Sequence, residues 1–178
     1  MSYSTIFPPA DEDISKVASD FSAISANGLI QGCVGCMDGL LIRVSAAPSL
    51  KQAKNPKAYY SGHYQDYGMN IKAICDSQCQ FTYASVAAPG GWNDLAVYRN
   101  SSIAQQIEKL PLGKYIVADN AYICTEHVLT PYSGSQKKDV PKDAYNFFLS
   151  QIRIRIEMTF DVWSISEQMA ILWLTRAM

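Results

Sequence analysis

Three acidic residues, far apart in the sequence, lie in surroundings that do not suit an ordinary solvent-exposed carboxylate. Asp38 falls inside an otherwise apolar stretch with the pattern of a buried strand, where an uncompensated carboxylate is costly. Asp119 follows a short continuous apolar run, at a strand end of the kind where ligands gather in open α/β sheets. Glu157 lies on an amphipathic helical pattern, where it shares a polar stripe with Ser150 and Arg153.

The chemistry open to these acids depends on what brings them together. Two carboxylates about 4 Å apart repel each other by roughly 4 kcal/mol at an effective dielectric constant of about 20, so only a shared cation or proton makes the pair tolerable. Divalent cations such as Mg²⁺ prefer oxygen ligands and keep several waters, which leaves room for a phosphate. Two such ions about 3.5–4 Å apart stabilise both the entering and the leaving oxygen at phosphorus. Three carboxylates therefore suit phosphodiester chemistry, whereas acid–base cleavage of sugars needs only two.

Each acid also has a purely structural interpretation. Asp38 and the glycine after it could form a bulge or a turn, and Asp119 could cap a helix. Glu157 could simply pair with Arg153 or Arg155 on the same helix. Spacing alone leaves these alternatives open.

The elements that must position the acids are predicted from apolar periodicity. In chain order they are a helix from Asp11 to about residue 27, a strand over 29–44, a hairpin of strands over 67–75 and 81–87, a helix from Asn93 or Asp94 to about 107, a buried strand over 114–118, and a helix over 144–163. The stretches 45–64 and 130–143 have the composition of loops. This order predicts a mixed α/β domain of three layers.

Length and composition exclude several classes of protein. A chain of 178 residues is one ordinary domain. Hydrophobic residues make up 48% of it, which excludes intrinsic disorder. No apolar run is long enough to span a membrane, and the first residues lack the pattern of a signal peptide, so we expect a protein that is neither membrane-bound nor secreted. The net charge of −1 argues against a strongly basic coat for nucleic acid.

The charges are nevertheless unevenly distributed. Between Gly39 and Gln65 there is no acid, and the cations are Arg43, Lys51, Lys54 and Lys57. Such a loop could face phosphates, or it could carry lysines for solubility alone. His63 belongs to the same stretch, and we expect it to be exposed to solvent.

The cysteines offer a different site. The pairs Cys33/Cys36 and Cys75/Cys79 have spacings used by zinc knuckles. Residues three apart on a strand point to opposite faces, however, and a free cysteine packs as a small hydrophobic residue. Core packing is therefore favoured, with a zinc site and a redox pair as the alternatives.

Four stretches follow one another in an order that resembles a known family: QGCVGCMDGLLIRV, YGMNIKAICDSQCQFTYASVAAPGGWNDLAVYRNS, YIVADNAYICTEHVLTPY and YNFFLSQIRIRIEMTF. They resemble DDE-superfamily transposase-derived nucleases of the PIF/Harbinger type. That family has an aspartate in an "iDG" strand, a "PG..nD" turn after a hairpin, a "DxxY" motif that ends a buried strand, and "N..lS..R...E..F" on a late helix. The resemblance runs from about Gln31 to Phe160.

The resemblance implies an RNase H-like fold, an α/β mixed sheet flanked by helices, and a divalent cation (Mg²⁺ or Mn²⁺) for hydrolysis or strand transfer at DNA phosphodiester bonds. Position by position, Asp38 matches the first acid of a catalytic and metal-binding Asp-Asp-Glu triad, and Glu157 matches the last. Asp119 is favoured as the middle acid because it ends the buried strand, with 37 residues between it and Glu157. Asp94, in the PGGWND turn, is the rival ligand and is otherwise a helix cap or a residue that supports the ligands.

Further residues take roles from the same resemblance. Tyr122 matches the tyrosine of the "DxxY" motif and is expected to pack. Arg153 and Arg155 match helix cations that steady Glu157 or contact a phosphate. The cations of the loop, Arg43, Lys51, Lys54 and Lys57, become candidates for DNA contacts. The resemblance implies the nucleus as the location, with the cytoplasm as the alternative.

The chain also departs from the family. No DNA-reading module precedes Gln31, Asp161 replaces the usual glycine, and the last residues lack basic character. We therefore expect a helical lead-in over 1–28, a nuclease domain over 29–163 and a divergent tail over 164–178. With a net charge of −1 the chain alone should bind DNA weakly, so a separate DNA-binding partner protein is expected, and the oligomeric state stays open. The alternative function is a catalytically inactive transposon-derived remnant that serves as a protein-interaction domain.

Overall fold

The computed structural model describes residues 2–3, 7, 11–44, 47–51, 53–99 and 101–176. Within these ranges the surroundings of the side chains at 2–3, 11–12, 87, 94, 137–138 and 165–176 are not described. The strands are β1 (Ser2–Tyr3), β2 (Cys33–Arg43), β3 (Tyr60–Ser61), β4 (Asp66–Cys75), β5 (Phe81–Pro89), β6 (Tyr115–Val117) and β7 (Val128–Leu129). The α-helices are α1 (Asp11–Ile24), α2 (Asp94–Arg99), α3 (Ser102–Ile107) and α4 (Val140–Arg176), and the 3-10 helices are η1 (Ala26–Gly28), η2 (Pro56–Tyr59) and η3 (Gly134–Lys138).

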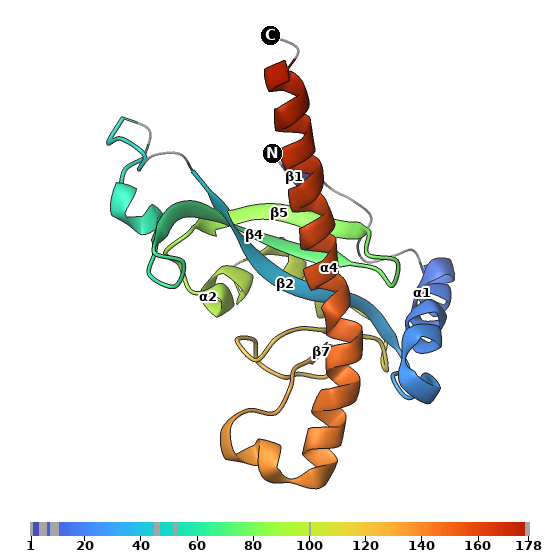
Figure 1. Ribbon diagram of the computed structural model, residues 1–178. Helices are drawn as coiled ribbons and strands as arrows, with labels where there is room; N and C mark the ends of the chain where they lie inside the picture. Colours follow the sequence, from blue (N-terminus) through green and yellow to red (C-terminus); the bar gives the residue numbers. More distant parts are fainter. Residues whose placement is uncertain are drawn as a thin grey trace.

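The sheet is mixed, with the strand order β1-β5-β4-β2-β6-β7 and with β3 paired to β4. The predicted hairpin is confirmed, because β4 and β5 are antiparallel neighbours. The short apolar run at 115–117 is a central strand that pairs in parallel with β2 on one side and with β7 on the other. Helices flank this sheet, as expected of an RNase H-like α/β fold (Figure 1).

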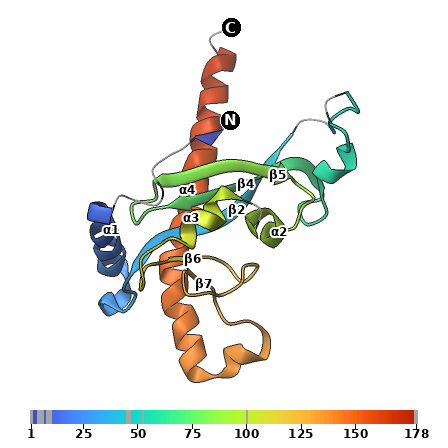
Figure 2. The ribbon, with the colours of Figure 1, turned by 180° about the vertical axis from the view of Figure 1, so that it is seen from behind.

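Each face of the sheet has its own apolar core. On one face, Leu149, Ile152 and Ile156 of α4 pack with cysteines and alanines of β2 and β4. On the other face, Ile103 and Ile107 of α3 pack with a second set of strand residues. Figures 1 and 2 show this arrangement from opposite sides, with α4 before the sheet in one view and α2 and α3 before it in the other. The three predicted layers are therefore present.

Alternation along β2 and the segment after β6 decides which face the acids occupy. Cys36 belongs to the core beneath α4 and Met37 to the opposite core, so Asp38 projects towards the α4 side. By the same alternation Val117 lies in the core beneath α4, and Asp119 follows it two residues later. The sheet thus directs both aspartates towards the helix that carries Glu157.

Two helix boundaries differ from the sequence-based expectation. The single helix predicted to reach residue 107 is broken into α2 and α3. Ser101 explains the break, because its hydroxyl accepts a hydrogen bond from the amide of Ala104 and caps α3 anew. The last helix begins at Val140 and runs through Arg176, so the stretch expected as a tail continues α4, and its final turns project beyond the sheet (Figure 1). The loops expected over 45–64 and 130–143 contain η2, β3 and η3.

The cysteines fill the core beneath α4. Cys33, Cys36 and Cys75 are fully buried, and the Cys36 thiol donates a hydrogen bond to the carbonyl of Ile152 at 3.2 Å. The core-packing interpretation is thus confirmed for these three. Over the described part of the chain, no helix has the long uncharged apolar stretch needed to cross a bilayer.

Candidate active site

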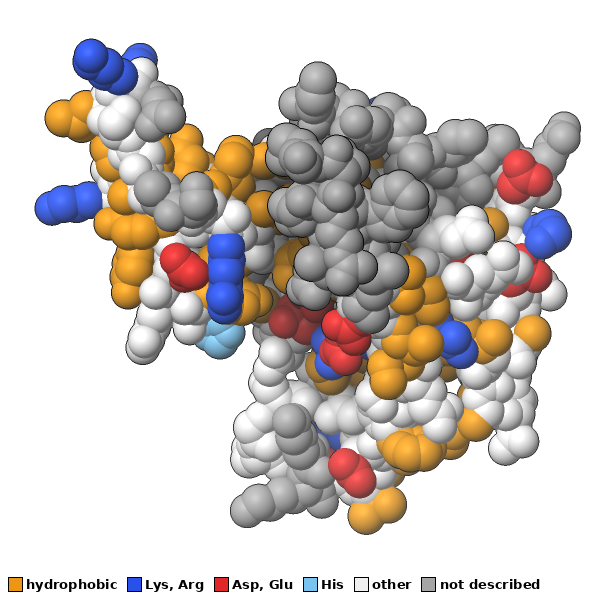
Figure 3. Space-filling model, turned by 45° about the horizontal axis from the view of Figure 1, so that its top comes forward, with side chains coloured by type: hydrophobic (Ala, Val, Ile, Leu, Met, Phe, Trp, Pro, Cys, Tyr) orange, Lys and Arg blue, Asp and Glu red, His pale blue; other side chains and the backbone are white. Residues whose placement is uncertain are grey.

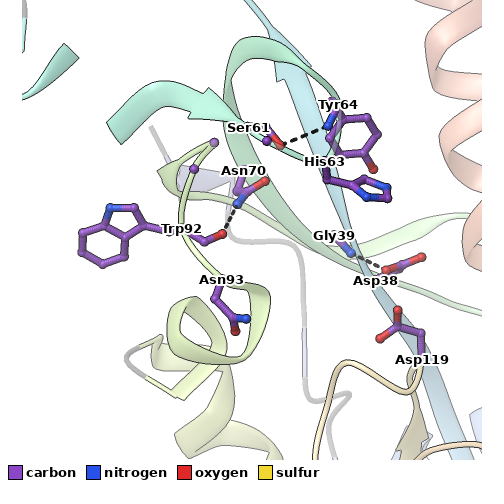
Figure 4. A pocket seen from close by; sticks show the side chains of 12 residues that line it. Asp38, Gly39, Ser61, His63, Tyr64, Asn70, Trp92, Asn93 and Asp119 are labelled. Atoms are coloured by element: carbon purple, nitrogen blue, oxygen red, sulfur yellow. Dashed lines mark hydrogen bonds between the residues drawn. The ribbon is translucent and has the colours of Figure 1, made fainter. Parts of the chain in front are cut away.

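A cleft of about 540 Å³ opens beside the middle of β2. Its lining comes from four places: the β2 residues Asp38 and Gly39, the hairpin residues 61–64 with Asn70 of β4, the turn residues 90–93 after β5, and Asp119 after β6. Segments from the whole sheet therefore meet at one hollow (Figure 4).

Asp38 is held in this cleft by the pairing of β2 with β4, where it lies opposite Ala73. Its carboxylate accepts a hydrogen bond from the amide of Gly39 at 2.7 Å. Burial raises the pKa of Asp38 from 3.8 to about 6; the Gly39 amide opposes this rise, and the negative charge of Asp119 adds to it. Asp38 is thus a carboxylate whose charge the protein does not fully compensate.

Asp119 reaches the same cleft from the turn that follows β6. Its Oδ1 accepts a hydrogen bond from the amide of Ala121 at 2.9 Å, which closes a turn and does not cap a helix, because residues 119–127 contain no helix. The side chain nevertheless lines the cleft, and in Figure 4 the carboxylates of Asp38 and Asp119 point towards each other. The structure therefore brings two of the three predicted acids together.

Glu157 lies on α4, outside the residues that line the cleft. It forms an ion pair with Arg153, whose Nη2 is 2.7 Å from Oε1. The charge of Arg153 also lowers the pKa of Asp38, so this guanidinium interacts with acids on both sides. Among the described residues no group of three His, Cys, Asp or Glu side chains is arranged to hold a metal ion. Arg153 thus interacts with both Glu157 and Asp38, while Glu157 itself does not line the cleft.

The comparison with known proteins shows the family of this chain. Residues 37–165, well over half of the chain, match the family model described as "DDE superfamily endonuclease". The chain belongs to this family of endonucleases. The matched region contains Asp38, Asp119 and Glu157, together with the rival Asp94.

One curated relative has a similar sequence. "Protein ALP1-like" from Arabidopsis thaliana is 26% identical over 147 residues, which cover 75% of this chain and 34% of the relative. The chain therefore spans about a third of the length of that relative. No solved structure matches the chain significantly.

The rival acid, Asp94, is the first residue of α2, and its side chain lies outside the described part of the structure. The cap of α2 is its neighbour Asn93, whose Oδ1 accepts hydrogen bonds from the amides of Leu95 at 2.9 Å and Ala96 at 3.4 Å. Asn93 also lines the cleft. The helix-cap role expected of either residue is therefore filled by Asn93.

Tyr122 packs in the core on the face opposite α4. Its ring lies edge-on to Tyr98, with centroids 5.4 Å apart, and its hydroxyl accepts a hydrogen bond from Lys72 at 2.7 Å. Lys72 is only 1% exposed. This hydrogen bond ties the turn that carries Asp119 to β4, so Tyr122 acts on the site by holding its framework.

The predicted cations lie at the end of β2 and on the arm between β2 and β4, which ends at the cleft. Arg43, Lys51, Lys54 and Lys57 are all exposed. Arg43 forms a weak ion pair with Asp66, at 3.5 Å. Figure 3 shows Lys and Arg side chains on the projecting arm, separated by a hollow from the body of the molecule. Arg155, the remaining predicted cation, is half-buried on α4, while the described ion pair of Glu157 is with Arg153.

Several cleft residues were not singled out by sequence reasoning, among them Ser61, Tyr64, Asn70 and Trp92. His63 is exposed, as expected, but it also lines the cleft. The signal that could have found them is the glycine pair at 90–91. A Cβ on Gly91 would lie 2.6 Å from the carbonyl oxygen of Tyr60, so only glycine lets this turn lie against the arm.

Proposed function

We propose that this domain cleaves or transfers DNA strands at the cleft, with Asp38, Asp119 and Glu157 as the metal-binding acids. The observation that carries the proposal is the pair of facing carboxylates of Asp38 and Asp119 in one cleft of an endonuclease-family domain. The match to the family spans all three acids, and it favours a nuclease over an inactive remnant.

The donor set suits Mg²⁺ or Mn²⁺. Both facing groups are carboxylates, which hard divalent cations prefer as ligands. The raised pKa of Asp38, at about 6, shows that burial and the charge of Asp119 disfavour its ionised form. A cation shared by the two oxygens would relieve that cost. When bound, it would supply positive charge to the phosphate and lower the pKa of a coordinated water.

In this proposal Glu157 leaves its ion pair with Arg153 and becomes the third carboxylate ligand of the cation. The exchange costs little, because the two side chains are 28% and 47% exposed and a partly exposed pair is worth only about 0.2–1 kcal/mol. The guanidinium of Arg153 then becomes available to a phosphate oxygen, which its planar donors bind well. Arg155 is the second cation of this helix that the family pattern suggests.

The reaction at phosphorus is a displacement. The oxygen of water, or of a DNA 3′-hydroxyl in strand transfer, bonds to phosphorus while the bond from phosphorus to the leaving oxygen breaks. The proton of the attacking group passes to a carboxylate or to solvent, and the leaving oxygen takes up a proton. Asp38 and Asp119, fixed by neighbouring strands, would orient the attacking group.

DNA would approach along the arm. Arg43 ends β2, and the arm that follows carries Lys51, Lys54 and Lys57 and continues into the lining of the cleft at Ser61. Four cations on a chain of net charge −1 would bind DNA weakly, since phosphate contacts supply much of the affinity. A separate DNA-binding partner protein, in the nucleus, would supply the rest.

The test is the nicking of supercoiled plasmid by the purified chain with Mg²⁺ or Mn²⁺. We expect Asp38→Asn, Asp119→Asn and Glu157→Gln each to lower the rate at least a hundredfold, whereas Asp94→Asn should retain most activity. Asp20→Asn is the matched control, because Asp20 is an exposed acid on α1 that pairs with Lys16. Equal nicking by wild type and Asp119→Asn would mean that a contaminant cuts the plasmid and that the proposal is wrong.

A further inference from the structure

Trp92 occupies an unusual position beside the cleft. It is 51% exposed, although tryptophan is a large apolar side chain. It lines the cleft of Asp38 and Asp119, and it also lines a second hollow of about 170 Å³ between β5 and the helices α2 and α3. In Figure 4 its indole points away from the two carboxylates. Trp92 therefore lies between the cleft and the second hollow.

The turn that carries Trp92 is firmly held. Its four hydrogen bonds run from the Trp92 amide to Pro89 O (3.1 Å), from the Gly90 amide to Gly68 O (2.9 Å), from the Gly91 amide to Ala58 O (2.8 Å), and from the Asn70 side chain to Trp92 O (3.1 Å). A Cβ on Gly90 would lie 2.5 Å from a methyl of Leu41, so the turn also packs closely. A partner that stacks on the indole therefore costs little backbone entropy in this turn.

The second hollow differs from the cleft in charge and size. Val86, Ala88 and Val97 line it with apolar side chains, and Tyr83, Ser85, Ser101 and Ser102 line it with hydroxyls. No charged side chain is among its described lining residues. At about 170 Å³ it is smaller than the roughly 300–1,000 Å³ of a drug-sized pocket, so it suits a single ring system.

These features select one kind of group from a DNA substrate. A phosphate would find no cation in the hollow, and a sugar has no flat face to stack. A nucleobase is flat and neutral, and its edge can exchange hydrogen bonds with serine hydroxyls. Every base can stack on an aromatic side chain, but only after it has left the stack of the double helix.

We propose that Trp92 and the hollow beside it form a subsite for one unpaired nucleobase, next to the phosphodiester held in the cleft. This inference rests on the proposed function and adds to it the form of the substrate: DNA with an unpaired nucleotide beside the bond that is cut. Because the described lining offers hydroxyls and apolar groups and no charged side chain, the subsite accepts any base.

The experiment measures binding without cleavage. A 12-nucleotide single strand with one central 2-aminopurine is titrated with the full chain in the presence of Ca²⁺, and a fully paired duplex and a duplex with one unpaired 2-aminopurine are titrated in parallel. We expect the single strand and the unpaired duplex to bind with quenched fluorescence, and the paired duplex to bind without quenching. Trp92→Ala should weaken binding of the single strand and of the duplex with the unpaired base at least tenfold, since stacking on the indole dominates the binding of an unpaired base.

Two further variants distinguish the loss of the subsite from a folding defect in Trp92→Ala. Trp92→Phe keeps an aromatic face and should stay within about threefold of wild type. Ser102→Phe, from an exposed position at the rim, should fill the hollow and weaken binding as Trp92→Ala does. Phe147→Ala is the matched control, because Phe147 is 57% exposed on α4 and lines neither hollow. Unchanged quenching in Trp92→Ala, or an equal loss in Phe147→Ala, would overturn the subsite.

Failure of the subsite and failure of the nuclease give different results. If Asp119→Asn abolishes nicking while Trp92→Ala binds the unpaired base like wild type, the subsite is wrong and the nuclease stands. If binding depends on Trp92 but nicking does not depend on the acids, the subsite stands as a nucleic-acid site and the nuclease proposal fails.

Discussion

The two sides of the candidate site are built differently. Asp38 lies on β2 and Asp119 just after β6, and the pairing of these strands, with Cys36 opposite Val117, sets their separation through the backbone. Glu157 lies on α4, and the described contact that orients its side chain is one ion pair with Arg153. Backbone pairing fixes a carboxylate in place, whereas an exposed ion pair leaves it able to move. The strand side is therefore pre-formed, and the helix side is adjustable.

The difference predicts unequal responses to metal. A cation that binds only the folded protein, at about 100 times its dissociation constant, stabilises it by roughly 2.7 kcal/mol, and each kcal/mol raises the melting temperature by about 2–4 °C at this size. Mn²⁺ should therefore raise the melting temperature of wild type by several degrees. Asp38→Asn or Asp119→Asn should abolish the rise, and Glu157→Gln should only reduce it. A full rise in Asp119→Asn would show that the metal binds elsewhere.

The strand side should also make the metal-free protein sensitive to pH. Because the pKa of Asp38 is raised to about 6 in the folded state, between about pH 4 and 6 the folded protein holds a proton there that the unfolded chain has released. The stability that the protonated Asp38 contributes is complete below about pH 4 and is lost as the pH rises through 6. Relative to wild type, Asp38→Asn should therefore gain on the order of 2 kcal/mol at pH 7 and little at pH 4.

Denaturant unfolding of the metal-free protein at both pH values measures this effect. Asn keeps an oxygen that can accept the hydrogen bond from the Gly39 amide, so the substitution removes the charge and little else. Asp20→Asn, on exposed α1, should show no comparable difference between the two pH values. An Asp38→Asn protein that is equally stabilised at pH 4 and 7 would contradict the assignment of the effect to this carboxyl.

The hydrogen bond between Lys72 and Tyr122, beneath the strand side, predicts a smaller change in the free energy of unfolding. Tyr122→Phe removes a hydroxyl that accepts a hydrogen bond from the buried ammonium of Lys72. Loss of one such acceptor should destabilise the protein by roughly 1–2 kcal/mol in thermal or denaturant unfolding. Tyr132→Phe, at an exposed tyrosine, is the control and should cost much less. If the turn also loosens, the melting-temperature rise with Mn²⁺ should shrink in Tyr122→Phe alone.

The strand side was also the part that sequence reasoning predicted best. The alternating patterns and the short apolar run over 114–118 correspond to β4, β5 and β6, because a buried strand leaves a strong signature in its own residues. The family match confirms the resemblance drawn from four stretches, of which those around Asp38 and Asp119 belong to the strand side. What those motifs did not reveal is that Asn70 and Trp92 share their cleft, since that depends on close packing between the arm and a glycine turn.

The helix side was harder to predict. Isoleucines four residues apart mark the part of α4 that packs on the sheet, but the ends of the helix at Val140 and Arg176 carry no such pattern. Apolar periodicity predicts where a helix lies, but it does not predict how the surface side chains of that helix are oriented. Pairing of Glu157 with Arg153 was one of the interpretations open from sequence, and the structure shows this ion pair. Whether Glu157 binds the same cation as the aspartates depends on the loss of its ion pair with Arg153, which the periodicity of the sequence does not predict.

The smallest predicted effect tests that exchange. Arg153→Ala removes the partner of Glu157, and because the pair is partly exposed the free energy of unfolding should fall by less than about 1 kcal/mol. Freed from the ion pair, Glu157 should favour the cation, so the Mn²⁺ concentration that gives half the melting-temperature rise should fall. Lys16→Ala, which breaks an exposed pair with Asp20 on α1, is the matched control and should leave that concentration unchanged. An Arg153→Ala protein that needs more Mn²⁺ would instead show that Arg153 holds Glu157 in its metal-binding position, and the helix side would then be as pre-formed as the strand side.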